Sequence, residues 1–353
     1  MSRIAKTDWT EVATRLISSV AITRLHPAVT KWVAKNDPVN ERRWAVAFSG
    51  GADSLALLLL LWAYWPERRA GLLVLHFNHC LRGRASTADA AFCRRLCAAL
   101  GVTFVVGGWK RARKGASEAE ARLARFEFFG RELSKRRIKA LWLGHQQDDI
   151  VETIFMRLAR GSGTAGLAAP RPVQMMPGGR VHLRPLLTLK KREIVEAMTE
   201  AGAVWREDAS NGTGDYLRNR IRNEVMPAWL AVAVDRDALE GAALSRELLE
   251  EDDVALETWL DALAPLSADG RLDLRMLAGK PRAVIRRALY RWLLGLQKDA
   301  GDLSRQGFTV LLAMVEAGKA TRFSLGRSGF AIIRKGVLLF EKASRRRLPG
   351  HRK

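Results

Sequence analysis

A short glycine-containing loop, Phe48-Ser49-Gly50-Gly51-Ala52-Asp53-Ser54, is the first segment whose residue types could do chemistry. It follows an apolar run and leads into the apolar stretch Leu55–Trp65, a pattern typical of a strand, a turn and a helix. Adjacent glycines let the backbone approach an oxyanion, and a helix N-terminus offers N–H groups and a positive dipole end. The lysine of a Gly-x-x-x-x-Gly-Lys-Ser/Thr loop is missing, and Asp53 would be tolerated among phosphates mainly as a Mg²⁺ ligand. The loop predicts phosphate binding; the alternative is an ordinary turn in which Asp53 caps the helix.

A second group of chemically competent residues follows the apolar run that ends at Gly144. His145 lies where a parallel sheet places ligands, at the carboxyl end of a strand. Asp148 and Glu152 are four residues apart on one side of the next predicted helix, and Asp149 is adjacent, so three carboxylates gather in its first turns. Such a patch either only stabilises the helix dipole or holds Mg²⁺ or the ammonium of a substrate amine.

Arginines form the third group. Ser117 and Glu120 have the spacing of a capping box, which predicts a helix start, and Arg122 and Arg125 lie in its first turns. Because arginines at a helix start oppose the dipole, they indicate an anionic partner such as phosphate or a carboxylate. The alternative is that they are surface side chains whose stems cover apolar neighbours.

The elements that would position these residues are short apolar runs separated by longer amphipathic stretches. The predicted strands are Trp44–Phe48, Gly71–Phe77, Thr103–Gly107, Lys139–Gly144 and Val181–Leu183. This alternation is typical of an α/β fold with a Rossmann-like parallel sheet wound by crossover helices. Residues 1–40 are predicted to form a polar, partly helical N-terminal extension.

The pattern changes after Pro227, where the regular strands stop. Helical patterns then occupy Asp235–Leu263, Asp273–Leu296 and Ser304–Ala317, followed by strand-like runs at Thr321–Leu325 and Phe330–Phe340. We therefore expect a boundary near residue 230 and a smaller, mostly helical C-terminal domain.

The net positive charge of the chain limits the kinds of partner that it could bind. The 59 Lys and Arg exceed the 37 Asp and Glu by 22 over 353 residues, which suits nucleic acid, an acidic membrane surface or plain solubility. The longest apolar stretch is far shorter than the ~20 residues that span a bilayer. The N-terminal residues lack the apolar segment of a secretion signal, and three cysteines cannot form a fully paired disulfide framework. We expect a cytoplasmic protein that does not cross a membrane.

The sequence Ser-Gly-Gly-x-Asp-Ser after a first strand resembles the loop of the N-type ATP pyrophosphatases, the PP-loop superfamily, which adenylate a substrate oxygen. Within that group, the chain from Ala45 to Leu230 resembles the tRNA(Ile)-lysidine synthases. The resemblance rests on the order and spacing of further segments: 76–83, 117–126, 143–153 with 160–163, 183–187, 205–211 and 216–222. This chain departs from the family at Cys80, where glycine is usual, and at Gln146, where a second histidine is frequent.

The resemblance implies an ATP-dependent ligase. It would join L-lysine to C2 of the cytidine at the first anticodon position (C34) of tRNA(Ile) with a CAU anticodon, through an adenylated tRNA, and give lysidine. It implies ATP contacts at Ser49, Gly50, Gly51, Ala52, Asp53 and Ser54, and catalytic roles for Asp53, Arg122, Arg125, His145, Asp149 and Glu152. It further implies tRNA contacts at Arg160, Arg218 and Arg222, with Mg²⁺ at Asp53 and Asp148.

The same resemblance implies the domain limits. Residues 41–230 would form the catalytic domain, 235–343 a tRNA-binding C-terminal domain and 344–353 a basic tail. The sequence leaves open which carboxylate binds or deprotonates lysine, and the oligomeric state.

Two other functions compete with this interpretation. A tRNA thiolase of the same superfamily would need reactive or cluster-binding cysteines, whereas Cys93 and Cys97 are expected on the inward face of a helix as inert thiols, although with Cys80 they could form a three-thiolate site. A non-catalytic basic RNA-binding protein would need the positive charge but not the four carboxylates Asp53, Asp148, Asp149 and Glu152.

Overall fold

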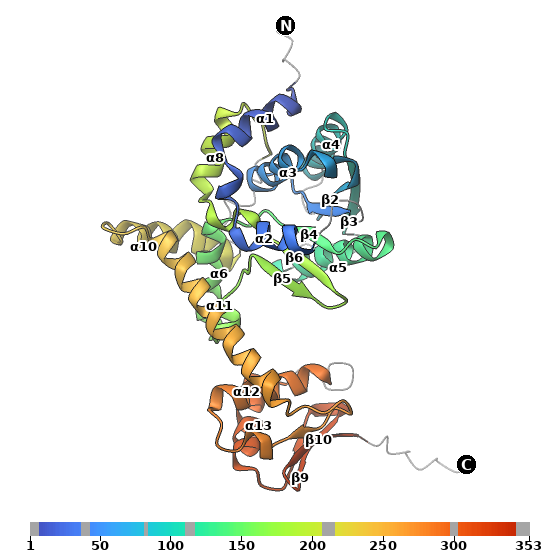
Figure 1. Cartoon of the computed structure of the whole chain (residues 1–353), viewed down its shortest axis with the longest axis vertical. Coiled ribbons are helices and arrows are strands. Elements are labelled where there is room, and N and C mark those ends of the chain that lie inside the picture. The colour runs from blue at the N-terminus through green and yellow to red at the C-terminus, as the bar shows by residue number, and fades with distance from the viewer. Residues whose placement is uncertain are drawn as a thin grey trace, which may run out of the picture. The chain divides into compact units, whose positions relative to one another are not determined.

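The computed structural model describes residues 7–36, 43–80, 84–109, 117–206, 216–296 and 303–343. The chain forms two compact units, Met1–Glu250 and Glu251–Lys353 (Figure 1). The division falls inside helix α11, Ala238–Leu263, rather than near residue 230. No helix in the described ranges is long and apolar enough to cross a membrane.

The first unit is built on a six-stranded sheet with the order β3-β2-β1-β4-β6-β5. Its strands are β1 Trp44–Ala47, β2 Leu72–Asn78, β3 Thr103–Gly108, β4 Ala140–Trp142, β5 Val173–Met176 and β6 Arg180–Leu183. All neighbours pair in parallel except β5, which is antiparallel to β6. The parallel α/β sheet is confirmed. Strand β5 was not predicted, because Gln174 interrupts a short run and its pairing depends on the turn at Gly178 and Gly179, both at positive φ.

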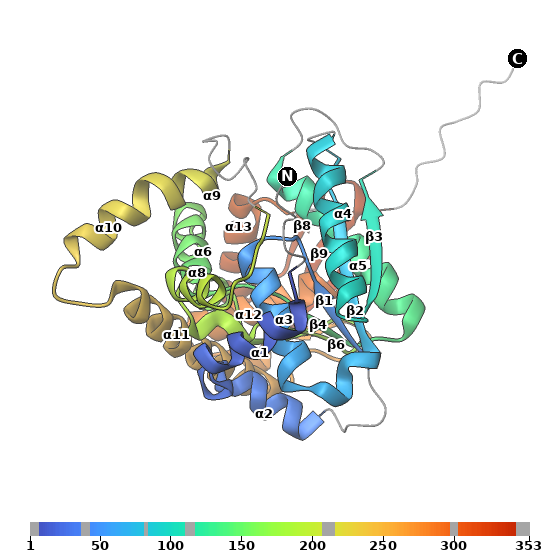
Figure 2. The same cartoon turned by 90° about the horizontal axis from the view of Figure 1, so that it is seen from above.

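Helices cover both faces of this sheet (Figures 1 and 2). Trp44 and Val46 of β1 face the cluster that contains helix α3, whereas Ala45 faces the cluster that contains α5. The larger helices of the unit are α1 Trp9–Ser19, α2 Pro27–Asn36, α3 Ala52–Tyr64, α4 Arg84–Ala99, α5 Glu118–Arg136, α6 Gln147–Arg160 and α8 Lys191–Glu200. The short ones are α7 Thr164–Leu167, α9 Leu217–Arg220, the π-helical turn η5 Ile221–Val225 and α10 Met226–Val232.

The N-terminal residues, predicted as a polar extension, contribute two helices to the core of this unit. Trp9, Val12 and Leu16 of α1 and Val29 of α2 are buried in the same cluster as α3. Helix α3 is apolar nearly all round, which requires cover on every side, and α1 supplies part of it. Helix α1 therefore packs against α3, the helix that follows the glycine loop.

The second unit combines helices with a sheet, so the expectation of a mostly helical domain was incomplete. Helices α12 Arg282–Gly295 and α13 Arg305–Ala317 accompany a four-stranded antiparallel sheet with the order β7-β10-β9-β8. The strands are β7 Leu272–Asp273, β8 Thr321–Ser324, β9 Gly329–Arg334 and β10 Val337–Lys342. The predicted run Phe330–Phe340 is a hairpin, because Lys335 and Gly336 adopt the positive φ of a tight turn. Strand β7 is too short to leave a pattern.

Candidate active site

The glycine loop lies at the carboxyl end of β1 and leads into α3, as predicted. Gly50 has φ +96°, and a Cβ there would lie 3.2 Å from Sγ of Cys93, so both backbone conformation and space require glycine. Gly51 occupies the N-cap position of α3, and Asp53 lies in its first turn. The alternative in which Asp53 caps the helix is therefore wrong.

The two serines of the loop bond to the loop itself. The Ser54 hydroxyl donates to the Gly51 carbonyl (3.0 Å) and accepts from the Ser49 N–H (3.2 Å), and the two hydroxyl oxygens are 3.0 Å apart. Because these contacts fix the turn, the hydroxyls shape the loop. An oxyanion would be met mainly by the N–H groups at the start of α3.

Gly144 brings the next strand against this loop. A Cβ at Gly144 would lie 3.0 Å from the carbonyl oxygen of Asp53 and 3.1 Å from Cα of Ser54. The absence of a side chain therefore lets the end of β4 approach the start of α3. His145 and helix α6, which follow directly, are placed beside the loop.

Asp53 and Asp148 both bond to Lys191, at the N-terminus of α8. Lys191 Nζ donates to Oδ1 of Asp53 (2.7 Å), and the Lys191 backbone N–H donates to Oδ2 of Asp148 (2.9 Å). Burial raises the pKa of Asp53, and Lys191 opposes that rise. We call Asp53, Asp148 and Lys191 the Asp53 cluster; its two carboxylates exceed its one cationic side chain.

The donors of the Asp53 cluster fit Mg²⁺. Carboxylate oxygens are its preferred protein ligands, and it takes one or two of them while keeping water and phosphate oxygens. Across the described ranges there is no group of three His, Cys, Asp or Glu side chains that could hold a metal ion. A cation shared with a nucleotide fits this donor set better than a metal enclosed by protein.

The other two predicted carboxylates are bound by arginines, and Asp149 is close enough to Asp53 to raise the pKa of Asp53 beyond the effect of burial. Arg218 bonds to both Asp149 and Glu152, with Nε 2.5 Å from Oε2 of Glu152, and Arg222 Nε lies 2.5 Å from Oε1 of Glu152. Glu152 is fully buried. Although burial opposes both effects, Arg218 lowers the pKa of Asp149, and Asp149 and Glu152 raise the pKa of Arg218.

The three carboxylates predicted as one patch are therefore divided by the start of α6. The Gln146 side chain accepts from the Asp148 N–H, and Oδ2 of Asp149 accepts from the Gln146 N–H (2.9 Å), which together form a capping box. This cap holds Asp149 back against the helix start, while Asp148 meets α8. Gln146, at the position where the family often has histidine, thus has a structural role in this chain.

Further arginines surround Asp149 and Glu152. Burial and the neighbouring Arg122 lower the pKa of both Arg125 and Arg184 to about 10, and burial and Arg218 lower that of Arg122. Arg122 and Arg125 flank the ring of Phe126, with guanidinium carbons 4.8 and 5.6 Å from its centre. Nε of Arg125 is buried without a hydrogen-bond partner. We call Arg122, Arg125, Arg184, Arg218 and Arg222, with Asp149 and Glu152, the arginine cluster; its cations exceed its carboxylates, which favours an anion.

His145 lies next to the arginine cluster. Arg184 Nε donates to Nδ1 of His145 (3.0 Å), so the neutral ring carries its proton on Nε2. Burial holds the pKa of His145 well below its ordinary value, and Arg184 lowers it further. His145 is therefore a neutral hydrogen-bonding group at neutral pH.

Sequence reasoning missed Lys191 and Arg184. Arg184 lies in the segment 183–187 and Lys191 shortly after it, and the resemblance of that segment carries no role for either residue. Arg160, predicted to contact tRNA, is exposed in the last turn of α6. Arg218 and Arg222, predicted with it, lie in the arginine cluster.

The cysteines are divided by burial. Cys93 and Cys97 are fully buried, as expected, and Cys80 is exposed. Burial raises the pKa of Cys93 to about 12 and also raises that of Cys97. Both thiols therefore stay protonated at neutral pH, which is unfavourable for a metal-bound thiolate.

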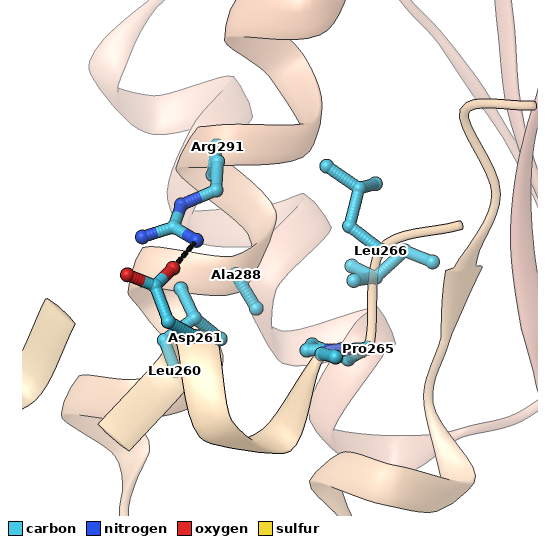
Figure 3. A pocket seen from close by; sticks show the side chains of 8 residues that line it. Leu260, Asp261, Pro265, Leu266, Ala288 and Arg291 are labelled. Carbon is cyan, nitrogen blue, oxygen red and sulfur yellow. Dashed lines mark hydrogen bonds and ion pairs between the residues drawn. The ribbon is translucent and has the colours of Figure 1, made fainter. Parts of the chain in front are cut away.

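The second unit contains a cavity of about 240 Å³ (Figure 3). Apolar side chains line most of it, and its charged groups, Asp261 and Arg291, form an ion pair with each other. None of the predicted site residues lines this cavity. It is separate in sequence from the two clusters described above.

The parallel sheet and the glycine loop after β1 define the class, an α/β domain of the PP-loop type, and residues 23–229 match the PP-loop domain model. The tRNA(Ile)-lysidine synthase of Symbiobacterium thermophilum is 35% identical over 297 residues, which cover 80% of this chain and 61% of that protein. That of Solibacter usitatus is 36% identical, with coverage of 79% and 62%, and that of Rhodopirellula baltica is 32% identical, with coverage of 70% and 68%.

The chain therefore belongs to the PP-loop family and, within it, to the tRNA(Ile)-lysidine synthases. It spans 61% and 62% of the length of the first two relatives.

Proposed function

We propose that the protein catalyses the ATP-dependent ligation of L-lysine to C2 of C34 in tRNA(Ile) with a CAU anticodon. The observation that carries this proposal is the pairing of two clusters of opposite excess charge beside one glycine loop. The reaction needs Mg²⁺ and cations for the phosphates of ATP and a carboxylate for the lysine ammonium, and the two clusters together supply these groups. The names of the relatives support the choice of tRNA and lysine.

In the first step, the C2 oxygen of the cytidine attacks the α-phosphorus of ATP and diphosphate leaves. We place the phosphates on the loop from Ser49 to Ser54, with Lys191 near the departing diphosphate. Asp53 and Asp148 would hold Mg²⁺, which would neutralise that diphosphate. Arg122 and Arg125, whose pKa values burial and neighbouring cations lower, supply positive charge for the phosphate in transition.

In the second step, the uncharged ε-amine of lysine attacks C2, and AMP leaves with the former C2 oxygen. The amine must first lose its proton, which requires a carboxylate close to it. We assign this role to the Asp149 and Glu152 pair. Because Arg218 bonds to both carboxylates and Arg222 bonds to Glu152, lysine must share them with these two arginines.

We assign tRNA binding to three parts of the chain. Arg160, Arg218 and Arg222 would contact phosphates near the anticodon. The second unit, with exposed cations such as Lys319 and Arg334, would hold the remainder of the tRNA. The base must be unstacked to reach the site, which costs less in an anticodon loop than in a duplex.

Release of diphosphate from ATP tests the proposal. We expect release only when tRNA(Ile) with a CAU anticodon is added, and lysine in the tRNA only when lysine is present. Diphosphate release without tRNA, or none with it, would contradict the proposal. Incorporation of sulfur in place of lysine would favour the thiolase.

A further inference from the structure

The carbonyl groups of the glycine loop are held from the protein side. His76 Nδ1 donates to the carbonyl of Phe48 (2.9 Å), and the Arg206 backbone N–H donates to the carbonyl of Gly50 (2.9 Å). The Gly51 carbonyl accepts from the Ser54 hydroxyl and from the Leu55 N–H, each at 3.0 Å. With these carbonyls engaged, an oxyanion would meet the N–H groups of the loop and of the start of α3, of which those of Ser49 and Gly51 also donate to Ser54 Oγ (3.2 Å) and Ser49 Oγ (3.3 Å).

The contact to Gly50 comes from a residue far along the chain that is itself anchored. Arg206 Nε donates to Oδ1 of Asp89 (2.8 Å), a carboxylate of helix α4 whose side chain is 11% exposed. Cβ and Cγ of Arg206 lie 3.7 Å from the position of a Cβ at Gly50. Cys93, one turn after Asp89 on α4, lies against the same glycine. Helix α4 therefore supports the loop directly through Cys93 and indirectly through Arg206.

We infer that Asp89 and Arg206 are positioning residues that keep the Gly50–Gly51 peptide oriented for phosphate binding; this inference rests on the proposed placement of ATP phosphates on the loop. Glycine rotates about its backbone bonds more freely than other residues, and besides the Ser49 hydroxyl, which accepts from the Gly51 N–H (3.3 Å), the Arg206 N–H restrains this peptide from outside the loop. If it rotates, its carbonyl oxygen turns toward the phosphates and repels them. The ion pair also neutralises Asp89, a carboxylate that would otherwise weaken phosphate binding.

Arg206→Ala and Asp89→Asn test the restraint in the full-length protein. Arg206→Ala keeps the backbone N–H and removes only its anchor, whereas Asp89→Asn keeps the shape and removes the charge. We expect each to weaken binding of a non-hydrolysable ATP analogue about tenfold, the effect of losing one charge-assisted hydrogen bond. The KM for ATP should rise with kcat and tRNA affinity nearly unchanged, and Arg206→Lys, which keeps a cation for Asp89, should recover most of the affinity.

Amide hydrogen exchange of residues 48–54 tests the same restraint without nucleotide. We expect faster exchange there in Arg206→Ala and Asp89→Asn, and wild-type exchange in the control Arg15→Ala, which breaks the exposed Arg15–Glu11 pair of α1. Unchanged loop exchange in both variants would overturn the inference. Faster exchange across the whole unit would also overturn it, because Asp89 would then be only structural. If the wild-type protein releases no diphosphate, the proposed function fails, and the exchange result still decides this inference.

Discussion

Asp148 and Asp149 are neighbours in the sequence, yet they belong to regions with opposite charge balance. Asp148 joins Asp53 at Lys191, whose side chain donates to Asp53 and whose backbone N–H donates to Asp148. Asp149 joins Glu152 among five arginines, three of which have depressed pKa values because burial and neighbouring cations destabilise their charge. The Asp53 cluster is suited to Mg²⁺, whereas the arginine cluster combines cations suited to a phosphate with two carboxylates suited to an amine.

This difference shows that charge type alone does not define the role of a residue in this site. Of the three carboxylates in the first turns of α6, Asp149 and Glu152 share Arg218, whereas Asp148 accepts from the Lys191 N–H. The capping box of Gln146 and Asp149 holds Asp149 against the helix start. In the proposed reaction, the Asp53 cluster serves the diphosphate and its Mg²⁺. The arginine cluster serves the phosphate in transition and the incoming lysine.

The largest effect should follow from removing Asp53. Asp53→Ala should lower diphosphate release by about a hundredfold or more, because the main proposed ligand of the Mg²⁺–diphosphate is removed. tRNA affinity, measured by filter binding, should stay within a few fold, since no tRNA contact is assigned to Asp53. Diphosphate release at the wild-type rate in this variant would show that the Asp53 cluster does not bind the Mg²⁺–diphosphate.

The next effect concerns the arginine cluster. Replacing Asp149 and Glu152 by Asn and Gln keeps shape and removes charge, so the lysine requirement should rise tenfold or more, because part of a charge attraction worth about 4 kcal/mol at 4 Å disappears. The requirement for ATP should change far less. If the double variant instead loses adenylation and keeps normal lysine affinity, these carboxylates serve ATP and the comparison fails.

Lys191 provides a second test of the Asp53 cluster. Lys191→Met should raise the KM for ATP about tenfold, because the substitution removes a cation next to Asp53 and the phosphates. Lys190→Met is the matched control, since Lys190 pairs with Asp237 instead. Equal effects of the two substitutions in steady-state assays would contradict a specific role for Lys191.

The smallest effect should come from the second unit. Replacing Lys319 and Arg334 by alanine should reduce the slope of log tRNA affinity against log salt by about one for each phosphate that is no longer neutralised. ATP binding should be unaffected, and Arg15→Ala provides a surface control. An unchanged slope in the double variant would show that these exposed cations do not bind tRNA.

Local features of this site could be predicted from the sequence, and partners across the sheet could not. The glycine loop and the capping box of Ser117 and Glu120 depend on residues within a few positions of one another, and both are present. Lys191 meets Asp53 across 138 positions of sequence, and Arg206 meets Asp89 across 117. Such pairs require the tertiary fold, for which a single sequence carries no direct signal.

The same limit applies to the fold. The parallel strands were recognisable because each is an apolar run between helices, whereas β5 and β7 are short strands whose pairing partner defines them. The direction of Asp148 and Asp149 depends on one side-chain cap at Gln146. Spacing of four residues correctly placed Asp148 and Glu152 on one helix but not in one cluster.

Transfer of label from α-³²P ATP to tRNA(Ile) in a single turnover without lysine tests the division between the clusters most directly. We expect that the wild-type protein and the Asp149→Asn, Glu152→Gln double variant both attach labelled AMP to the tRNA, whereas Asp53→Ala does not. Added lysine should then release labelled AMP rapidly from the wild-type protein and slowly from the double variant. Labelling by Asp53→Ala at the wild-type rate, or loss of labelling in the double variant, would contradict this division of roles between the two clusters.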